Sequence, residues 1–219
     1  MTLNMVYFET LRDKINLRLS ELVRDGKVDA DQAKNQIEQY PWLYGALGMV
    51  PSDVMFICEN PSLRGIGKAY VETIDGGPPD IEAQWWGGSN DFAACRFRVA
   101  LYQLNLKTTR ERDRDGWECY VTNVIKQSNS AKEQEALASD VKQQQAWDWA
   151  DVLQWELDYV KPKYVFCMGS NAFTYVHLLQ RAEKITQFPV YKLMHYSARG
   201  NTQKIIEGIV SGVRSVLPK

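Results

Sequence analysis

Residues 54–62 read Val54-Met-Phe-Ile-Cys-Glu-Asn-Pro-Ser62, so five apolar residues run directly into a short polar turn. An apolar run of this length that ends at a turn is typical of a buried β-strand. The Asn-Pro pair that follows is a common turn sequence. The stretch therefore predicts a strand over residues 54–58 that delivers polar side chains to one end of a sheet.

Three further strands alternate with helices along the chain. Strands are predicted at residues 117–125, 164–168 and 190–194, and helices at 91–106, 131–160 and 201–216 and from the cap at Ser170 to Arg181. The helix over 131–160 is expected to bury one stripe of apolar side chains, namely Leu137, Val141, Val152, Leu153, Leu157 and Val160. This alternation predicts an α/β fold of three layers, α/β/α, with a short, mainly parallel four-stranded sheet and helices on both faces.

The N-terminal part of the chain reads as two helices separated near Asp25-Gly26. Between residues 3 and 40, apolar residues recur at helical spacing with charges on the other face, as Leu11, Ile15, Leu19 and Leu22 show. We expect residues 1–45 to form a helical hairpin that packs on a catalytic body formed by residues 46–219.

Composition limits the class of protein. The 219 residues are 45% hydrophobic and carry a net charge of −1, so any DNA contact has to come from a local basic patch. No apolar run is long enough to span a bilayer, and no signal peptide is evident, so we expect a cytoplasmic protein. Four scattered cysteines and two histidines predict buried thiols, with no metal and no cofactor, and the cysteines are Cys58, Cys95, Cys119 and Cys167.

Polar side chains follow each predicted strand. Glu59 and Asn60 follow the first strand, Asn123 and Lys126 lie near the end of the second, and residues 169–171 and 195–199 follow the third and fourth. In open parallel sheets, ligands bind beyond the carboxyl ends of the strands. The sequence therefore predicts a site at this edge.

These segments resemble motifs of the uracil-DNA glycosylase superfamily. Met55-Phe-Ile-Cys-Glu-Asn-Pro-Ser62 is similar to its first motif, and Asn60 holds the position of the catalytic asparagine in the mismatch-specific and single-strand-selective branches. Glu59 falls where the iron–sulfur branch has a glutamate. Tyr120-Val-Thr-Asn-Val-Ile-Lys126 resembles the strand with the base-reading asparagine, which maps to Asn123.

The resemblance continues through the second half of the chain. Pro162-Lys-Tyr-Val-Phe-Cys-Met-Gly169 looks like the third strand of the family, and His195-Tyr-Ser197 resembles its His-Pro-Ser motif. Tyr196 replaces the proline, which frees a backbone torsion in that loop. Gln127 stands where the iron–sulfur branch has a cysteine, so no cluster is expected. A long segment between residues 62 and 85 could reshape the base pocket, which leaves the identity of the base open.

The resemblance implies hydrolysis of an N-glycosidic bond in DNA after the base leaves the stack. Asn60 would orient the attacking water, and Glu59 is an alternative as a base or as a stabiliser of the sugar cation. The amide of Asn123 can pair with the edge of a pyrimidine, and His195 can donate to the base oxygen on which charge accumulates.

The remaining candidates are expected to contact the flat face of the extruded base or the DNA phosphates. Trp85 and Trp86 are candidates for stacking on the extruded base. The predicted phosphate contacts are Ser62, Arg64, Lys68, Lys126, Ser170, Ser197 and Arg199. We expect a monomer that binds DNA and no membrane.

Two other functions remain open at this point. The first is a glycosylase for a modified base, including a defence enzyme that acts on foreign DNA. The second is a non-catalytic member of the fold that binds DNA or a protein. A phosphate-binding loop at Arg64-Gly-Ile-Gly-Lys68 is disfavoured because the spacing of that motif is incomplete.

Overall fold

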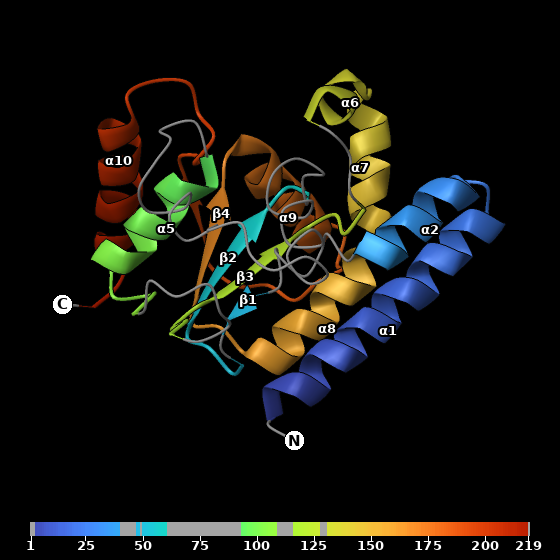
Figure 1. Cartoon of the computed structure of the whole chain (residues 1–219), viewed down its shortest axis with the longest axis horizontal. Helices are drawn as coiled ribbons and strands as arrows, with labels where there is room; N and C mark the ends of the chain where they lie inside the picture. Colours follow the sequence, from blue (N-terminus) through green and yellow to red (C-terminus); the bar gives the residue numbers. More distant parts are fainter. Residues whose placement is uncertain are drawn as a thin grey trace, which may run out of the picture.

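The computed structural model describes residues 3–39, 47–48, 50–60, 93–108, 116–127 and 131–218. The strands are β1 (Leu47–Gly48), β2 (Val54–Cys58), β3 (Tyr120–Asn123), β4 (Tyr164–Met168) and β5 (Val190–Leu193). They form one sheet in the order β1-β3-β2-β4-β5 (Figure 1). Neighbouring strands pair in parallel in the order β3, β2, β4 and β5, whereas the two-residue β1 runs antiparallel to β3. The predicted α/β fold is confirmed, and β1 is an addition to it.

Helices cover both faces of the sheet. They are α1 (Leu3–Arg24), α2 (Ala30–Gln39), α5 (Ala93–Gln103), α6 (Ala131–Ala136), α7 (Ser139–Asp148), α8 (Ala150–Val160), α9 (Ser170–Arg181) and α10 (Thr202–Arg214). Figure 1 shows α5 and α10 on one side of the sheet and α8 and α9 on the other. The sheet therefore lies between two helical layers, as the alternation of elements predicts.

Alternation of side chains along the strands divides the core in two. On β2, Met55 and Ile57 pack in the cluster with α8 and α9, and Phe56 and Cys58 pack in the cluster with α5 and α10. Successive residues of a strand point to opposite faces, which explains this division. The same rule decides on which side each polar residue at the strand ends is directed.

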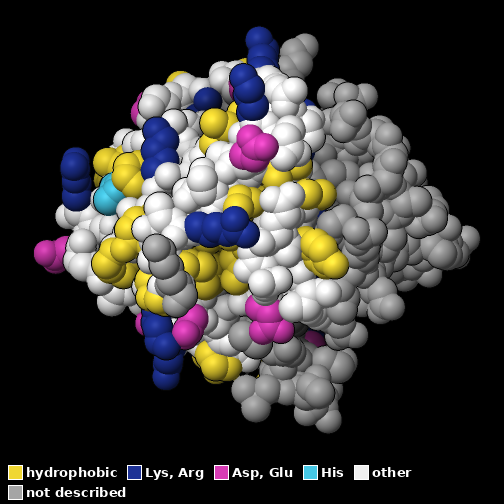
Figure 2. All heavy atoms as spheres, turned by 90° about the vertical axis from the view of Figure 1, so that its left-hand side faces the viewer, with side chains coloured by type: hydrophobic (Ala, Val, Ile, Leu, Met, Phe, Trp, Pro, Cys, Tyr) yellow, Lys and Arg dark blue, Asp and Glu magenta, His cyan; other side chains and the backbone are white. Residues whose placement is uncertain are grey.

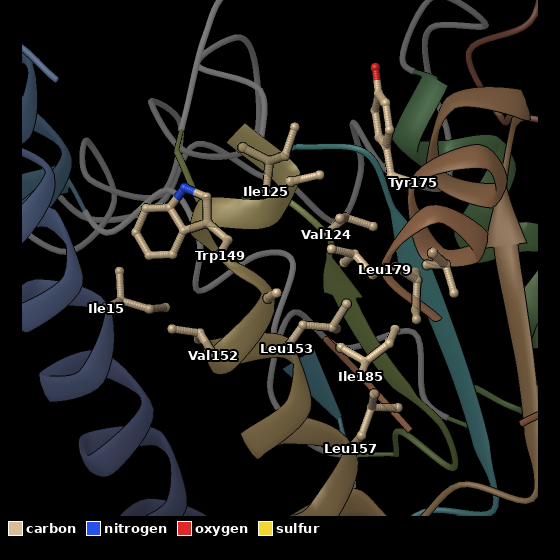
Figure 3. Close-up of a cluster of buried hydrophobic side chains, with 14 of the residues drawn as sticks. Ile15, Val124, Ile125, Trp149, Val152, Leu153, Leu157, Tyr175, Leu179 and Ile185 are labelled. Carbon is tan, nitrogen blue, oxygen red and sulfur yellow. The ribbon is translucent and has the colours of Figure 1, made fainter. Parts of the chain in front are cut away.

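The N-terminal helix α1 contributes to the core on the α8 side. Leu11, Ile15 and Leu19 are fully buried, at the helical spacing that predicted their burial. Figure 3 shows Ile15 directed toward Trp149 and Val152, next to α8. A positive φ of 69° at Gly26 follows the end of α1, where the chain turns toward α2. The division of the chain between residues 45 and 46 stays a prediction.

The single helix predicted over residues 131–160 is wrong, because the chain forms α6, α7 and α8 there. Ala138 is extended, with φ −61° and ψ 153°, and Trp149 interrupts the helix at φ −106° and ψ 4°. The interruption at Trp149 leaves its side chain fully buried. Val141 is 43% exposed, so the predicted apolar stripe holds only in α8, where its four members are buried, Val152, Leu153, Leu157 and Val160.

The strand predicted over residues 117–125 is also shorter than expected. It spans Tyr120–Asn123, and Trp117 makes only an isolated antiparallel bridge to Lys107. Three cysteines are buried with free thiols, as predicted, and they are Cys58, Cys119 and Cys167. The helices that the structure describes include none with the length and apolar content needed to cross a bilayer.

Candidate active site

The ends of β2 and β3 lie at the same level of the sheet. Cys58 is paired with Asn123, and the backbone N–H groups of Val124 and Ile125 donate to the carbonyls of Cys58 and Glu59, both at 2.9 Å. The parallel pairing therefore continues past the last strand residues. The segments with Asn60 and Asn123 leave the sheet side by side.

The turn after β4 contacts the segment after β5, which places His195 at this edge of the sheet. The Gly169 N–H donates to the carbonyl of Leu193 at 2.9 Å, which ties the turn to the end of β5. Gly169 has φ 89° and ψ 173°, a backbone conformation that only glycine adopts without strain. A Cβ on Gly169 would lie 3.2 Å from the Cβ of His195 and 3.3 Å from its Cδ2. Glycine thus permits the close approach of the imidazole.

We expect Gly169→Ala to lower stability and to displace the imidazole of His195. The backbone conformation costs about 1–3 kcal/mol for a residue with a Cβ, and the added methyl group displaces the imidazole. The control is Gly26→Ala, which also has a positive φ but no atom within 4 Å of the added Cβ. Thermal unfolding and the NMR signals of the His195 ring compare the two. Equal shifts of these signals in both variants would contradict the role given to the contact with His195.

The local contacts of His195 determine which ring nitrogen carries the proton. The backbone N–H of Ser197 donates to Nδ1 at 3.1 Å, and the Ser197 hydroxyl lies 2.5 Å from the same atom. Because Nδ1 accepts a hydrogen bond, the neutral ring carries its proton on Nε2. Burial lowers the pKa of His195 below its usual 6.5, which favours this neutral form. Nε2 is therefore a neutral hydrogen-bond donor.

Tyr196, which replaces the proline of the family motif, anchors the loop of His195. Its ring stacks on His195, with centroids 4.3 Å apart, and on Phe97 of α5 at 5.4 Å. Its hydroxyl lies close to the thiol of Cys58, the last residue of β2. Arg96 donates to the carbonyls of Tyr196 and Ala198 at 3.4 and 3.1 Å. Side-chain contacts thus hold a loop that lacks the rigidity of proline.

Asn123 is the last residue of β3 and is only 4% exposed. The hydroxyl of the preceding Thr122 bonds Glu156 of α8, so alternation directs the Asn123 side chain to the α5 side. No described residue hydrogen-bonds its side-chain amide.

Glu59 is directed to the opposite side of the sheet. Its two carboxylate oxygens accept hydrogen bonds from Asn171 of α9 at 2.9 Å and from Gln134 of α6 at 3.4 Å. Burial, and then the charge of Glu59, raise the pKa of Tyr175 to about 12. Figure 3 shows the Tyr175 hydroxyl pointing away from the apolar cluster below it. Glu59 therefore faces α6 and α9 rather than the side of Asn123.

The prediction that Lys126 contacts a phosphate is wrong. Lys126 is 2% exposed, and its ammonium forms an ion pair with Glu156, which is fully buried. Burial lowers the pKa of Lys126 while Glu156 opposes that change. The ammonium is enclosed in the protein and cannot reach a DNA backbone.

The other predicted phosphate contacts divide into two groups. Ser170, Ser197 and Arg199 are exposed at the carboxyl edge. Outside the described residues lie Ser62, Arg64, Lys68, Trp85 and Trp86. Figure 2 shows that the described Lys and Arg side chains on the face of α5 and α10 are scattered among Asp and Glu.

Sequence reasoning missed the residues that support the edge. Arg96 and Phe97 hold the His195 loop, and Asn171 and Gln134 hold Glu59. Asn171 lies in a segment that follows a strand, which was a usable signal. Arg96 and Phe97 lie within a helix without a motif, so only the packed structure reveals their role.

A comparison with known proteins identifies the family of the chain. The family model described as the uracil DNA glycosylase superfamily matches residues 47–207. A search of curated proteins found no match. The matched range contains all four parallel strands and the segments that follow them. The chain therefore belongs to the uracil-DNA glycosylase superfamily.

Proposed function

We propose that this chain is a monofunctional DNA glycosylase that hydrolyses the N-glycosidic bond of a flipped pyrimidine, uracil or a modified base, and leaves an abasic site. The observation that carries the proposal is the hydrogen bond from the Ser197 N–H to Nδ1 of His195. It leaves Nε2 as a neutral donor at the carboxyl edge of the sheet. Family membership supports a glycosylase-like fold around this donor.

Base release needs a donor at the departing base. When the bond between C1′ and the base nitrogen breaks, the electron pair leaves with the base, and negative charge gathers on its carbonyl oxygens. A preorganised donor stabilises this charge more than that of the bound substrate, so it accelerates the reaction. The Nε2–H of His195 takes this role, since Tyr196 and Gly169 hold the ring in place.

Water then adds to the sugar cation at C1′ and loses a proton, which neutralises the departed base anion. We assign the orientation of this water to Asn60, two residues after β2, because its side-chain oxygen can accept a hydrogen bond. Both oxygens of Glu59 already accept amide hydrogen bonds on the opposite side of the sheet. This arrangement favours Asn60 over Glu59 for the water.

Asn123 reads the base in this proposal. Its amide presents one donor and one acceptor, which match adjacent C=O and N–H groups on a pyrimidine edge. The low exposure of Asn123 and the absence of a described partner for its amide support this role. Ser170, Ser197 and Arg199 contact phosphates, together with Ser62, Arg64 and Lys68. Trp85 and Trp86 stack on the base.

The test is cleavage of oligonucleotides that each carry one uracil or one modified pyrimidine, in single and double strands. Alkali-labile sites detected on gels report base removal. We expect product from at least one probe and a loss of about 100-fold with Asn60→Ala, because a misplaced reactant costs about that much. Asn105→Gly, which removes an exposed amide in the turn after α5, is the control and should keep full activity.

Two results would contradict the proposal in different ways. Binding of DNA without abasic product from any probe would favour a non-catalytic binder. Full activity of Asn60→Ala alongside an active wild-type protein would remove Asn60 from the site but leave the reaction class intact. Product only from modified bases would favour the defence role over repair of uracil.

A further inference from the structure

The ammonium of Lys126 is enclosed by three acceptors at the end of β3. Nζ donates to the Thr122 hydroxyl and to the Asn123 carbonyl, both at 2.6 Å, and to Oε2 of Glu156. An ammonium has three N–H donors and no acceptor, so each donor has a partner of its own. The third contact joins β3 to α8.

The carboxylate of Glu156 sets the direction of the remaining hydrogen bonds. Its Oε1 accepts from the hydroxyls of Tyr120 and Thr122, both at 2.7 Å. An ionised carboxylate only accepts hydrogen bonds, so the Tyr120 hydroxyl donates a hydrogen bond to Oε1. The hydroxyl of Tyr7, 2.7 Å from that of Tyr120, must then donate to the Tyr120 oxygen. A directed chain of hydrogen bonds thus links α1 to Lys126.

The network contacts Asn123 through the backbone carbonyl of that residue. The Lys126 ammonium binds that carbonyl next to Thr122, while the Asn123 side chain is directed to the other face of the sheet. The carbonyl and the side-chain amide are attached to the same Cα atom, so a shift of this part of the backbone also moves the amide. Lys126 therefore acts on the candidate base-reading amide without reaching the base itself.

This inference rests on the proposed role of Asn123 in reading the base. We propose that Lys126 is a positioning residue for Asn123, held in place by Glu156 and Thr122 and connected through Tyr120 to Tyr7 of α1. The N-terminal helix is then coupled to base recognition and does more than cover the core. A purely structural ion pair would stabilise the fold equally well but would leave the aim of Asn123 unchanged.

The test uses the full chain with Lys126→Met/Glu156→Met, which removes both charges together and strands neither. The control is Lys163→Met/Asp53→Asn, an ion pair of 2.8 Å at the amino ends of β4 and β2. Two quantities are measured for each protein. They are the NMR signals of the backbone and side-chain amides of Asn123, and the single-turnover rate on the probe that the wild-type protein cleaves.

We expect the Asn123 signals to shift in the Lys126 variant and to stay unchanged in the control. The rate should fall about 10- to 100-fold in the Lys126 variant. Introduced into an Asn123→Ala background, the same two substitutions should change the rate by less than about twofold, because the residue that they position is already gone. A structural role predicts the same loss in both backgrounds.

The two arms separate the inference from the function on which it rests. Unchanged Asn123 signals would overturn the positioning role, whatever the rates. Shifted signals in a protein that cleaves no probe would uphold positioning and refute glycosylase activity. If the double variant does not fold, Thr122→Val replaces it, because it removes one acceptor of the ammonium and keeps the ion pair; unchanged signals there would equally overturn the role.

Discussion

Replacing His195 with alanine is expected to lower the rate of base release by about 10²–10³-fold, the usual cost of removing one donor from a developing negative charge. The effect should fall on the chemical step and leave DNA binding nearly unchanged, since the donor matters most as the bond breaks. Single-turnover cleavage at saturating protein measures this rate directly. A filter-binding or anisotropy titration of the same probe measures the binding.

The matched control is the other histidine of the chain. His177 lies within α9 and stacks edge-on against Phe173 at 4.3 Å, so His177→Ala should keep the wild-type rate. A His195→Ala protein that cleaves as fast as His177→Ala would exclude the proposed donor.

The pH profile gives a second readout on His195. Burial lowers its pKa in the folded protein, whereas the unfolded chain binds the proton near the ordinary value of about 6.5. Between these two values the unfolded state carries more protons, so the stability contributed by this group is present above about pH 6.5 and is lost as the pH falls through the lower pKa of the folded state. His195→Ala should weaken this acid dependence of unfolding.

Lys126→Met should destabilise the fold by about 3–5 kcal/mol, because it leaves the carboxylate of Glu156 buried without its counter-ion. Glu156 is fully buried, and the Tyr120 and Thr122 hydroxyls alone cannot replace the lost charge. For a protein of this size each kcal/mol lowers the melting temperature by about 2–4 °C. Urea unfolding at neutral pH gives the free energy, and thermal unfolding gives the shift.

The double variant Lys126→Met/Glu156→Met isolates the cause. Removal of both charges should recover most of the lost stability, because apolar side chains of similar volume replace a buried ion pair at little cost. If the double variant were as unstable as Lys126→Met, the loss would come from packing or from the lost hydrogen bonds of Tyr120 and Thr122 rather than from the stranded charge.

The parts of the fold that depend on local pattern were predictable. The bounds of β2 and β4 agree with the predicted strands, because uninterrupted apolar runs between turn residues are a local signal. The break at Trp149 was not predictable in the same way, since nothing in the periodicity of residues 131–160 marks it. At the break the indole of Trp149 is buried, and Ile15 of α1, more than a hundred residues earlier, is directed toward it.

The candidate site was likewise predictable only in part. The positions of Asn60, Asn123 and His195 at or just after the ends of three strands could be predicted, because parallel strands bring their carboxyl ends to one edge. The surroundings of each side chain could not. Lys126 follows a strand just as the other predicted site residues do, yet its ammonium pairs with Glu156 of α8 in the protein interior.

Sequence alone thus determined the order of the elements, the edge at which polar residues gather and the resemblance that names the family, because these depend on residue type and spacing. Tertiary structure alone decided which partners hold each polar residue. Glu59 is held by α6 and α9, Lys126 by α8, and the His195 loop by α5. The physical reason is that the partners of a buried or tethered polar group come from distant parts of the chain, and only packing brings them within hydrogen-bond distance.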